Sequence, residues 1–110
     1  MKIAVISDVH GNKSALDKVL DDIKQKKADK IYCLGDIAMG GYDPNYTIDK
    51  LFELKNKMND DFEIIQGNTD KLIVDYNDTL YEKMLKANPL MAQALNLDVK
   101  IIDDDKKRLL

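Results

Sequence analysis

Hydrophobic residues along the chain form short continuous runs that alternate with stretches of helical spacing. Three runs predict strands over residues 1–7, 30–34 and 62–66. The first contains Ile3-Ala4-Val5-Ile6 without a polar interruption, a pattern typical of a strand that is buried on both faces. The third ends at a Gly-Asn pair, and the second at a Gly-Asp pair.

Two amphipathic stretches separate these strands and predict helices. Residues 14–27 carry a single apolar stripe, and Ser14 with Asp17 predicts a capping box at its start. Residues 43–58 begin with Asp43 as N-cap and Pro44 at the first helical position. The resulting order βαβαβ predicts an α/β fold with a parallel sheet and right-handed crossovers.

The remaining residues, 76–110, are predicted to be mainly helical. Thr79 and Glu82 form a second potential capping box, and Pro89 interrupts the apolar stripe that follows. Residues 99–102 fit either a short strand or an extended link. The acidic run 103–105 predicts the start of a last helix of about two turns.

Composition limits the classes of protein that fit. A chain of 110 residues with 45% hydrophobic and 34% charged residues suits one soluble globular domain. The net charge of −3 weakens the class of polyanion binders, so we expect no sequence-specific nucleic-acid partner. A single cysteine, Cys33, excludes an internal disulfide framework. Without an apolar run of membrane-spanning length or a signal-peptide pattern, we expect no membrane association and a cytoplasmic location.

Residues of the kind that bind metals follow each predicted strand. Asp8 and His10 follow the first, Asp36 follows the second, and Asn68 follows the third. Each is an ordinary turn residue by itself, but the carboxyl ends of parallel strands meet at one edge, so the four side chains should converge. Oxygen ligands with one imidazole suit Mn²⁺, Fe or Zn²⁺.

These motifs resemble those of a known family. Asp8-x-His10, Gly35-Asp36 and Gly67-Asn68-x-Asp70 are similar to the first three motif blocks of the calcineurin-like metallophosphoesterases. The segment 41–45 also resembles that of a prokaryotic branch of small phosphodiesterases. The resemblance implies that residues 1–75 form the βαβαβ parallel-sheet half of a four-layer α/β/β/α fold, and that residues 76–110 form a helical cap or insertion.

The resemblance also implies a site with two divalent metals, of which Mn²⁺ is favoured and Fe, Zn²⁺, Ni²⁺ and Mg²⁺ are alternatives. Asp8 and His10 would bind the first metal, Asp36 would bridge the two, and Asn68 would bind the second. The metals would activate a water that attacks a phosphate mono- or diester in line, and a nucleotide-like ester is one candidate substrate. The turns expected to shape the binding site contain Gly11, Asn12, Gly35 and Gly67.

The sequence departs from the family pattern in two places. Thr69 replaces the histidine that protonates the leaving group, and a threonine hydroxyl can at best donate a hydrogen bond to a phosphate oxygen. Asp70, the usual partner of that histidine, then acts either at the site or only as a helix cap. Asp36, Asn68, Thr69 and Asp70 are thus the candidate catalytic residues. The family has three further histidines, whereas His10 is the only histidine present here.

Three interpretations follow from these departures. We expect the 110 residues to be one truncated domain of a longer phosphoesterase, with weak or no activity of their own. Exposed apolar surface on the unfinished sheet would then favour self-association. The alternative is a catalytically silent metal- or phosphate-binding module, or a regulatory relative. A receiver-like domain is disfavoured, because Asn68 stands where a phospho-acceptor aspartate would follow the third strand.

Overall fold

A computed structural model describes all residues from 1 to 110. A three-stranded parallel sheet of order β1-β2-β3 is followed by helices, which confirms the predicted α/β architecture. The elements in chain order are β1 (Ile3–Ile6), α1 (Lys13–Gln25), β2 (Lys30–Cys33), α2 (Pro44–Met58), the 3₁₀ turn η1 (Asn59–Asp61), β3 (Phe62–Ile64), α3 (Asn68–Val74), α4 (Asp78–Ala87), α5 (Pro89–Ile101) and α6 (Asp104–Lys107).

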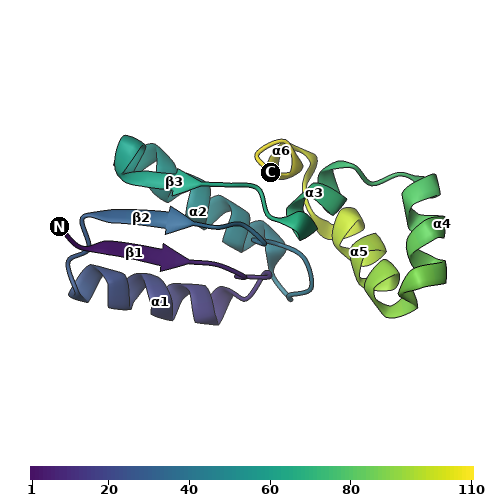
Figure 1. The fold of residues 1–110 in the computed structure, drawn as a ribbon, viewed down its shortest axis with the longest axis horizontal. Coiled ribbons are helices and arrows are strands. Elements are labelled where there is room, and N and C mark those ends of the chain that lie inside the picture. Colours follow the sequence, from purple (N-terminus) through teal and green to yellow (C-terminus); the bar gives the residue numbers. More distant parts are fainter.

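The molecule is elongated, with extents of 46 × 21 × 20 Å. Figure 1 shows the sheet with α1 and α2 toward one end of the long axis, and α4 and α5 at the other end. The core lies between one face of the sheet and the helices, and it continues through α3 into α5. Its most deeply buried side chains are Ile37, Ile48, Leu51, Phe62 and Leu95.

The sheet is covered on one face only, so the prediction that the first strand is buried on both faces is wrong. Ile3 and Val5 are 50% and 60% exposed, whereas Ala4 and Ile6 pack against the core. Side chains alternate between the two faces of a strand, and both crossover helices lie on the side of Ala4 and Ile6. A continuous apolar run therefore does not by itself establish that both faces are buried.

Asparagine side chains cap two helices where the sequence predicted other residues. The Asn12 side chain accepts a hydrogen bond from the backbone N–H of Ala15 at 3.1 Å, so α1 begins at Lys13 and not at the predicted Ser14 box. The Ser14 hydroxyl instead lies 2.9 Å from the Tyr42 hydroxyl. Asn77 likewise replaces Thr79 as the cap of α4. Asparagine is among the best N-cap residues, and it lies two positions upstream of the predicted cap in both cases.

The ambiguous segment 99–102 belongs to α5 as far as Ile101, and neither a strand nor an extended link forms there. Leu95, Asp98 and Ile102 are buried with helical spacing, so packing outweighs the β-branched side chains. The acidic run does begin a helix, but α6 has only four residues. The side chain of Asn45 joins the two helices to α2, since it donates to the Ile101 carbonyl and accepts from the Asp103 N–H, both at 2.9 Å.

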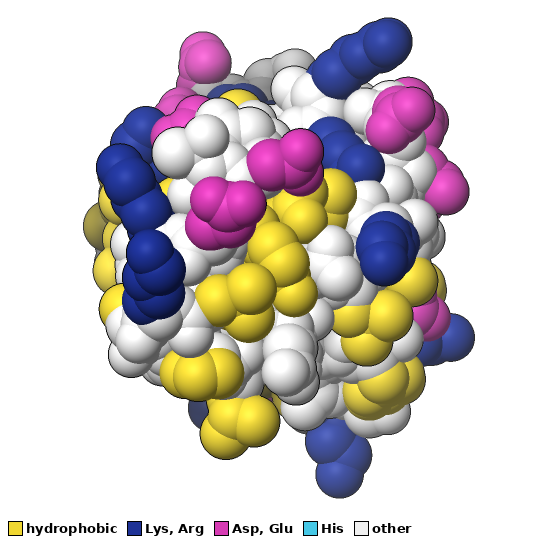
Figure 2. All heavy atoms as spheres, turned by 90° about the vertical axis from the view of Figure 1, so that its right-hand side faces the viewer, with side chains coloured by type: hydrophobic (Ala, Val, Ile, Leu, Met, Phe, Trp, Pro, Cys, Tyr) yellow, Lys and Arg dark blue, Asp and Glu magenta, His cyan; other side chains and the backbone are white.

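The outer end of the molecule exposes several hydrophobic side chains. Figure 2 shows them gathered in a patch with acidic and basic side chains around it. Leu90 and Leu97 of α5 are 80% and 59% exposed. None of the helices combines the length and the apolar character needed to cross a bilayer.

Candidate metal centre

The candidate site begins where β1 and β2 leave the sheet side by side. Beyond the last paired residues, the Asp8 N–H donates to the Gly35 carbonyl at 3.2 Å, and the His10 N–H donates to the Asp36 carbonyl at 2.9 Å. Backbone hydrogen bonding thus continues from the parallel strands into the two loops. These backbone hydrogen bonds alone place Asp8 and His10 beside Asp36, independently of any side-chain contact.

The three side chains converge as the sequence predicted. One potential ligand atom from each of Asp8, His10 and Asp36 lies within 4.8 Å of the others. All three residues also have left-handed backbone conformations, with φ of 58°, 49° and 57°. Such a conformation costs a residue with a side chain about 1–2 kcal/mol, and it is concentrated at functional sites. The backbone is therefore strained at the residues that the site brings together.

The imidazole of His10 is held in an orientation suited to a ligand. Its Nδ1 lies 2.7 Å from the carbonyl oxygen of Met39, which can only accept, so Nδ1 carries the proton. The other ring nitrogen, Nε2, lies 3.2 Å from Asp8 Oδ1, so it donates to that carboxylate when it is protonated and can bind a cation through its lone pair when it is not. Metal-binding histidines are commonly oriented in this way by a carbonyl behind the ring.

The environment of Asp8 favours its ionised form. The Ser7 hydroxyl donates to Oδ2 at 2.7 Å, and together with the neighbouring His10 it lowers the pKa of Asp8. An ionised carboxylate is the form that binds a divalent cation. Sequence analysis did not identify Ser7, whose role is visible only from the direction of its hydroxyl.

Asp36 is held from the opposite side by Thr69. Its Oδ1 accepts from the Thr69 backbone N–H at 2.9 Å and from the Thr69 hydroxyl at 2.6 Å. The hydroxyl is therefore directed at Asp36, and the expectation that it donates to a phosphate oxygen has no support in this arrangement. Thr69, which follows β3, thus orients the carboxylate of Asp36, which follows β2.

The Asn68 side chain lies against the same carboxylate. With its amide nitrogen turned toward Asp36, it donates to Oδ1 at 3.1 Å and to Oδ2 at 3.0 Å. Rotating the amide by half a turn places its oxygen there instead, beside the carboxylate oxygens. Two oxygen acceptors pointing at one another are unfavourable unless a cation lies between them. In either orientation the Asn68 side chain lies beside the Asp36 carboxylate.

Asp70 is buried next to the site, with 1% of the residue exposed. It accepts from the N–H groups of Asp36 at 2.8 Å, Ile37 at 2.9 Å and Gly67 at 3.0 Å. The last of these caps α3, and the other two tie the loop after β2 to the loop after β3. Asp70 is therefore a structural anchor as well as a cap, and it does not reach the ligand atoms directly.

Glycines allow the loops to approach each other more closely than side chains would permit. A Cβ atom on Gly35 would lie 2.2 Å from the Gly67 nitrogen, and one on Gly67 would lie 2.3 Å from Asp36 Oδ1. Gly11 would similarly meet the Ala38 carbonyl at 2.8 Å. These three glycines thus allow neighbouring loops to pack closely, while the Asn12 side chain caps α1.

We expect Gly35→Ala to destabilise the protein more than Gly40→Ala. Both glycines have nearly the same φ, +94° and +92°, but a Cβ on Gly40 meets nothing within 4 Å. The Gly40 variant should lose about 1–2 kcal/mol from backbone strain alone. The Gly35 variant should lose about 1–3 kcal/mol more from the clash with Gly67. Urea unfolding of both variants measures the difference, and equal losses would show that the loops separate freely.

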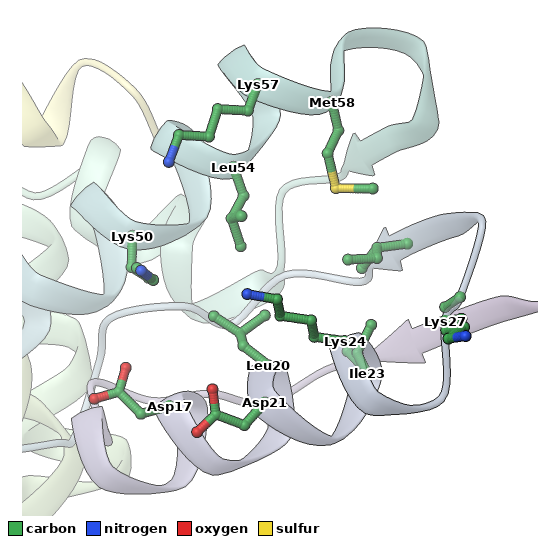
Figure 3. A pocket seen from close by; sticks show the side chains of 12 residues that line it. Asp17, Leu20, Asp21, Ile23, Lys24, Lys27, Lys50, Leu54, Lys57 and Met58 are labelled. Atoms are coloured by element: carbon green, nitrogen blue, oxygen red, sulfur yellow. The ribbon is translucent and has the colours of Figure 1, made fainter.

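The largest cavity does not belong to this site. A groove of about 620 Å³ lies between α1 and α2 and extends toward the opposite ends of the strands. Figure 3 shows the apolar side chains of Leu20 and Leu54 directed into it, with Asp21 on one side and Lys50 on the other. Acidic and basic side chains both line the groove, so its charge does not select one ligand.

Comparison with known structures finds proteins that share this fold. The structure is similar to that of a metallophosphoesterase from Sphaerobacter thermophilus, with a TM-score of 0.67 and 27% sequence identity over 98% of this chain and 39% of that chain. A cold-active protein tyrosine phosphatase shares the fold, with a TM-score of 0.54, 18% identity, and coverage of 97% of this chain and 32% of that chain.

Sequence comparison gives a consistent result. An uncharacterized protein of Methanocaldococcus jannaschii is 50% identical over 52 residues, which cover 47% of this chain and 21% of that protein. The chain thus spans well under half the length of the relatives it matches. The calcineurin-like phosphoesterase superfamily domain matches residues 1–110, the whole chain. The chain therefore belongs to the calcineurin-like phosphoesterase superfamily.

Proposed function

We propose that this chain provides the first ligands of a phosphoesterase that uses two divalent metals, Mn²⁺ in preference to Fe, Zn²⁺, Ni²⁺ or Mg²⁺, to hydrolyse phosphate mono- or diesters. The observation that carries the proposal is the convergence of Asp8, His10 and Asp36 within 4.8 Å at the carboxyl ends of adjacent strands. Two carboxylates and one imidazole form a donor set that suits a first-row divalent cation. The metals, when bound, would activate water and neutralise charge on the phosphate oxygens.

Each residue would contribute a distinct part. Asp8 and the Nε2 atom of His10 would hold the first cation, and Asp36 would face both cation positions. Thr69 would keep Asp36 in place through its two hydrogen bonds to Oδ1. Asn68 would present its amide oxygen to the second position after the rotation described above, without adding a negative charge. Asp70 would fix the loops on which Asp36 and Asn68 lie.

We expect hydrolysis by the 110 residues alone to be weak. Thr69 cannot protonate a leaving group at neutral pH, and its hydroxyl is already engaged with Asp36. His10 supplies the only imidazole. With so few ligands, the second cation should bind more weakly than the first. Substrates with good leaving groups, such as bis-p-nitrophenyl phosphate, should therefore be favoured.

A catalytically silent module that binds metal or phosphate is the second candidate. The observation that favours it is the same Thr69 hydroxyl, which supports Asp36 and leaves the site without an acid. In that case the four ligands would bind cations without turnover.

The test is Mn²⁺ binding by calorimetry together with hydrolysis of bis-p-nitrophenyl phosphate, each compared with Asp36→Ala. Weak hydrolysis that requires Mn²⁺ and is lost in the variant supports the phosphoesterase. Mn²⁺ binding that is lost in the variant, with no hydrolysis above background, supports the silent module. Absence of Mn²⁺ binding refutes the phosphoesterase and the metal-binding form of the silent module, and vigorous hydrolysis refutes the expected weakness.

A further inference from the structure

Asp98 is a buried carboxylate far from the candidate ligands in the sequence. It lies in α5, and only 3% of the residue is exposed. Its Oδ2 accepts a hydrogen bond from the backbone N–H of Gly40 at 2.9 Å, across a separation of 58 residues. No cationic side chain forms an ion pair with it. Burying an unpaired carboxylate is costly, so its position calls for an explanation beyond packing.

The partner of Asp98 belongs to the peptide group that orients His10. The carbonyl of Met39 and the N–H of Gly40 are the two ends of a single peptide unit. The carbonyl lies 2.7 Å from His10 Nδ1, and the N–H donates to Asp98. Because a peptide unit is planar and its C=O and N–H point in opposite directions, holding one end fixes the direction of the other.

The carboxylate of Asp98 at the N–H end of this peptide unit also makes the Met39 carbonyl a stronger hydrogen-bond acceptor. Hydrogen bonds in a chain polarise one another, and a charged acceptor has the largest effect. The Met39 oxygen thus becomes a better acceptor, which favours the proton of neutral His10 on Nδ1. In many metal sites a carboxylate contacts the ligating histidine directly and orients it. Here the Met39–Gly40 peptide unit lies between the Asp98 carboxylate and the His10 imidazole.

We propose that Asp98 is a positioning residue that acts through the Met39–Gly40 peptide to keep His10 in its Nδ1–H form, with Nε2 facing Asp8 and Asp36. The proposal rests on the proposed metal site for its purpose, but the effect on His10 exists without metal. It also gives the helical segment a role, because α5 then supports the site from a distance.

Two opposing effects act on the charge of Asp98. Burial raises the pKa of its carboxyl, and the hydrogen bond from Gly40 acts in the opposite direction. An asparagine could accept the same hydrogen bond without the desolvation of a charge. The charge itself is therefore the property that distinguishes aspartate at this position.

The experiment measures the imidazole tautomer of His10 in the metal-free protein by long-range ¹H–¹⁵N correlation, at a pH where the ring is neutral. His10 is the only histidine, so the spectrum contains one ring. The unaltered protein should show the proton predominantly on Nδ1, which lies 2.7 Å from the Met39 carbonyl, although Nε2 lies 3.2 Å from the competing acceptor Asp8 Oδ1. In Asp98→Leu, and to a smaller extent in the isosteric Asp98→Asn, the population should shift toward protonated Nε2. Asp78→Asn, an exposed change in α4, is the matched control and should leave the tautomer unchanged.

Mn²⁺ affinity is the second readout. We expect Asp98→Leu to weaken Mn²⁺ binding about 10- to 100-fold, and Asp98→Asn less, as is typical for the outer partners of metal ligands. An unchanged tautomer in folded Asp98→Asn and Asp98→Leu overturns the proposal, and if the leucine variant does not fold, the asparagine variant alone decides. A tautomer shift without Mn²⁺ binding in any protein would support the positioning role and refute the proposed function.

Discussion

Replacing Asp70 with alanine is expected to lower the free energy of unfolding by about 3–5 kcal/mol, a large share of the stability of a small domain. The substitution removes the acceptor of three backbone N–H groups and leaves those of Asp36 and Ile37 without a partner in a largely buried place. Each unsatisfied donor costs about 1–3 kcal/mol. The loops after β2 and β3 would lose their shared anchor at the same time.

Urea unfolding followed by circular dichroism measures this loss, and Asp75→Ala is the matched control. Asp75 lies at the end of the same helix, half exposed, and pairs only with Lys71 at 2.6 Å. Its removal should cost no more than about 0.5 kcal/mol. The stability loss of Asp70→Asn should lie between those of Asp70→Ala and Asp75→Ala. The amide oxygen still accepts a backbone hydrogen bond, but the amide NH₂ group faces a backbone N–H that has then lost its acceptor. A loss below about 1 kcal/mol for Asp70→Ala would contradict the anchoring role.

Replacing Asp36 with asparagine is expected to weaken Mn²⁺ binding by about 100-fold or more, with a much smaller effect on folding. The amide keeps the shape of the side chain, and its oxygen can still accept from the N–H and hydroxyl of Thr69. It removes the charge that faces both proposed cation positions. Both cations should therefore be affected, whereas Asn68→Ala should weaken mainly the second.

Calorimetric titration with Mn²⁺ tests this prediction, and Asp29→Asn is the control. Asp29 is an exposed carboxylate at the other end of the sheet, where it accepts from the Lys2 N–H at 2.8 Å. Both variants lose one negative charge, so a general electrostatic effect would reduce binding equally. Equal affinities for the two variants would mean that Mn²⁺ binds through bulk charge and that Asp36 is not a ligand.

The parts of the fold that depend on neighbouring residues could be predicted from the sequence. Asp43 and Pro44 specify the start of α2 by local hydrogen bonding and a fixed φ, and α2 ends at Met58 as expected. The strand exits could be predicted too, because parallel strands bring their carboxyl ends together whatever the loops do. This rule alone predicts that Asp8, His10 and Asp36 lie close together, as they do.

The parts that depend on distant packing could not be predicted. Val5 is exposed because both crossover helices lie on one face, and the apolar run of β1 contains no sign of that. The orientation of His10 depends on a backbone carbonyl, which has no signature in the amino-acid sequence. Asp98 contacts Gly40 over 58 residues, so only the tertiary fold reveals it. Thr69 was recognised as a departure, but its bond to Asp36 was not foreseen.

The most direct test of the central claim locates the bound cation. Mn²⁺ is paramagnetic, so substoichiometric Mn²⁺ should broaden the amide resonances of nearby residues in a ¹H–¹⁵N spectrum. We expect the signals of Asp8, His10, Asp36 and Asn68 to disappear first, and this pattern to be absent in Asp36→Asn. Broadening centred on the acidic run 103–105, or spread evenly over the surface, would contradict a metal site at the strand exits.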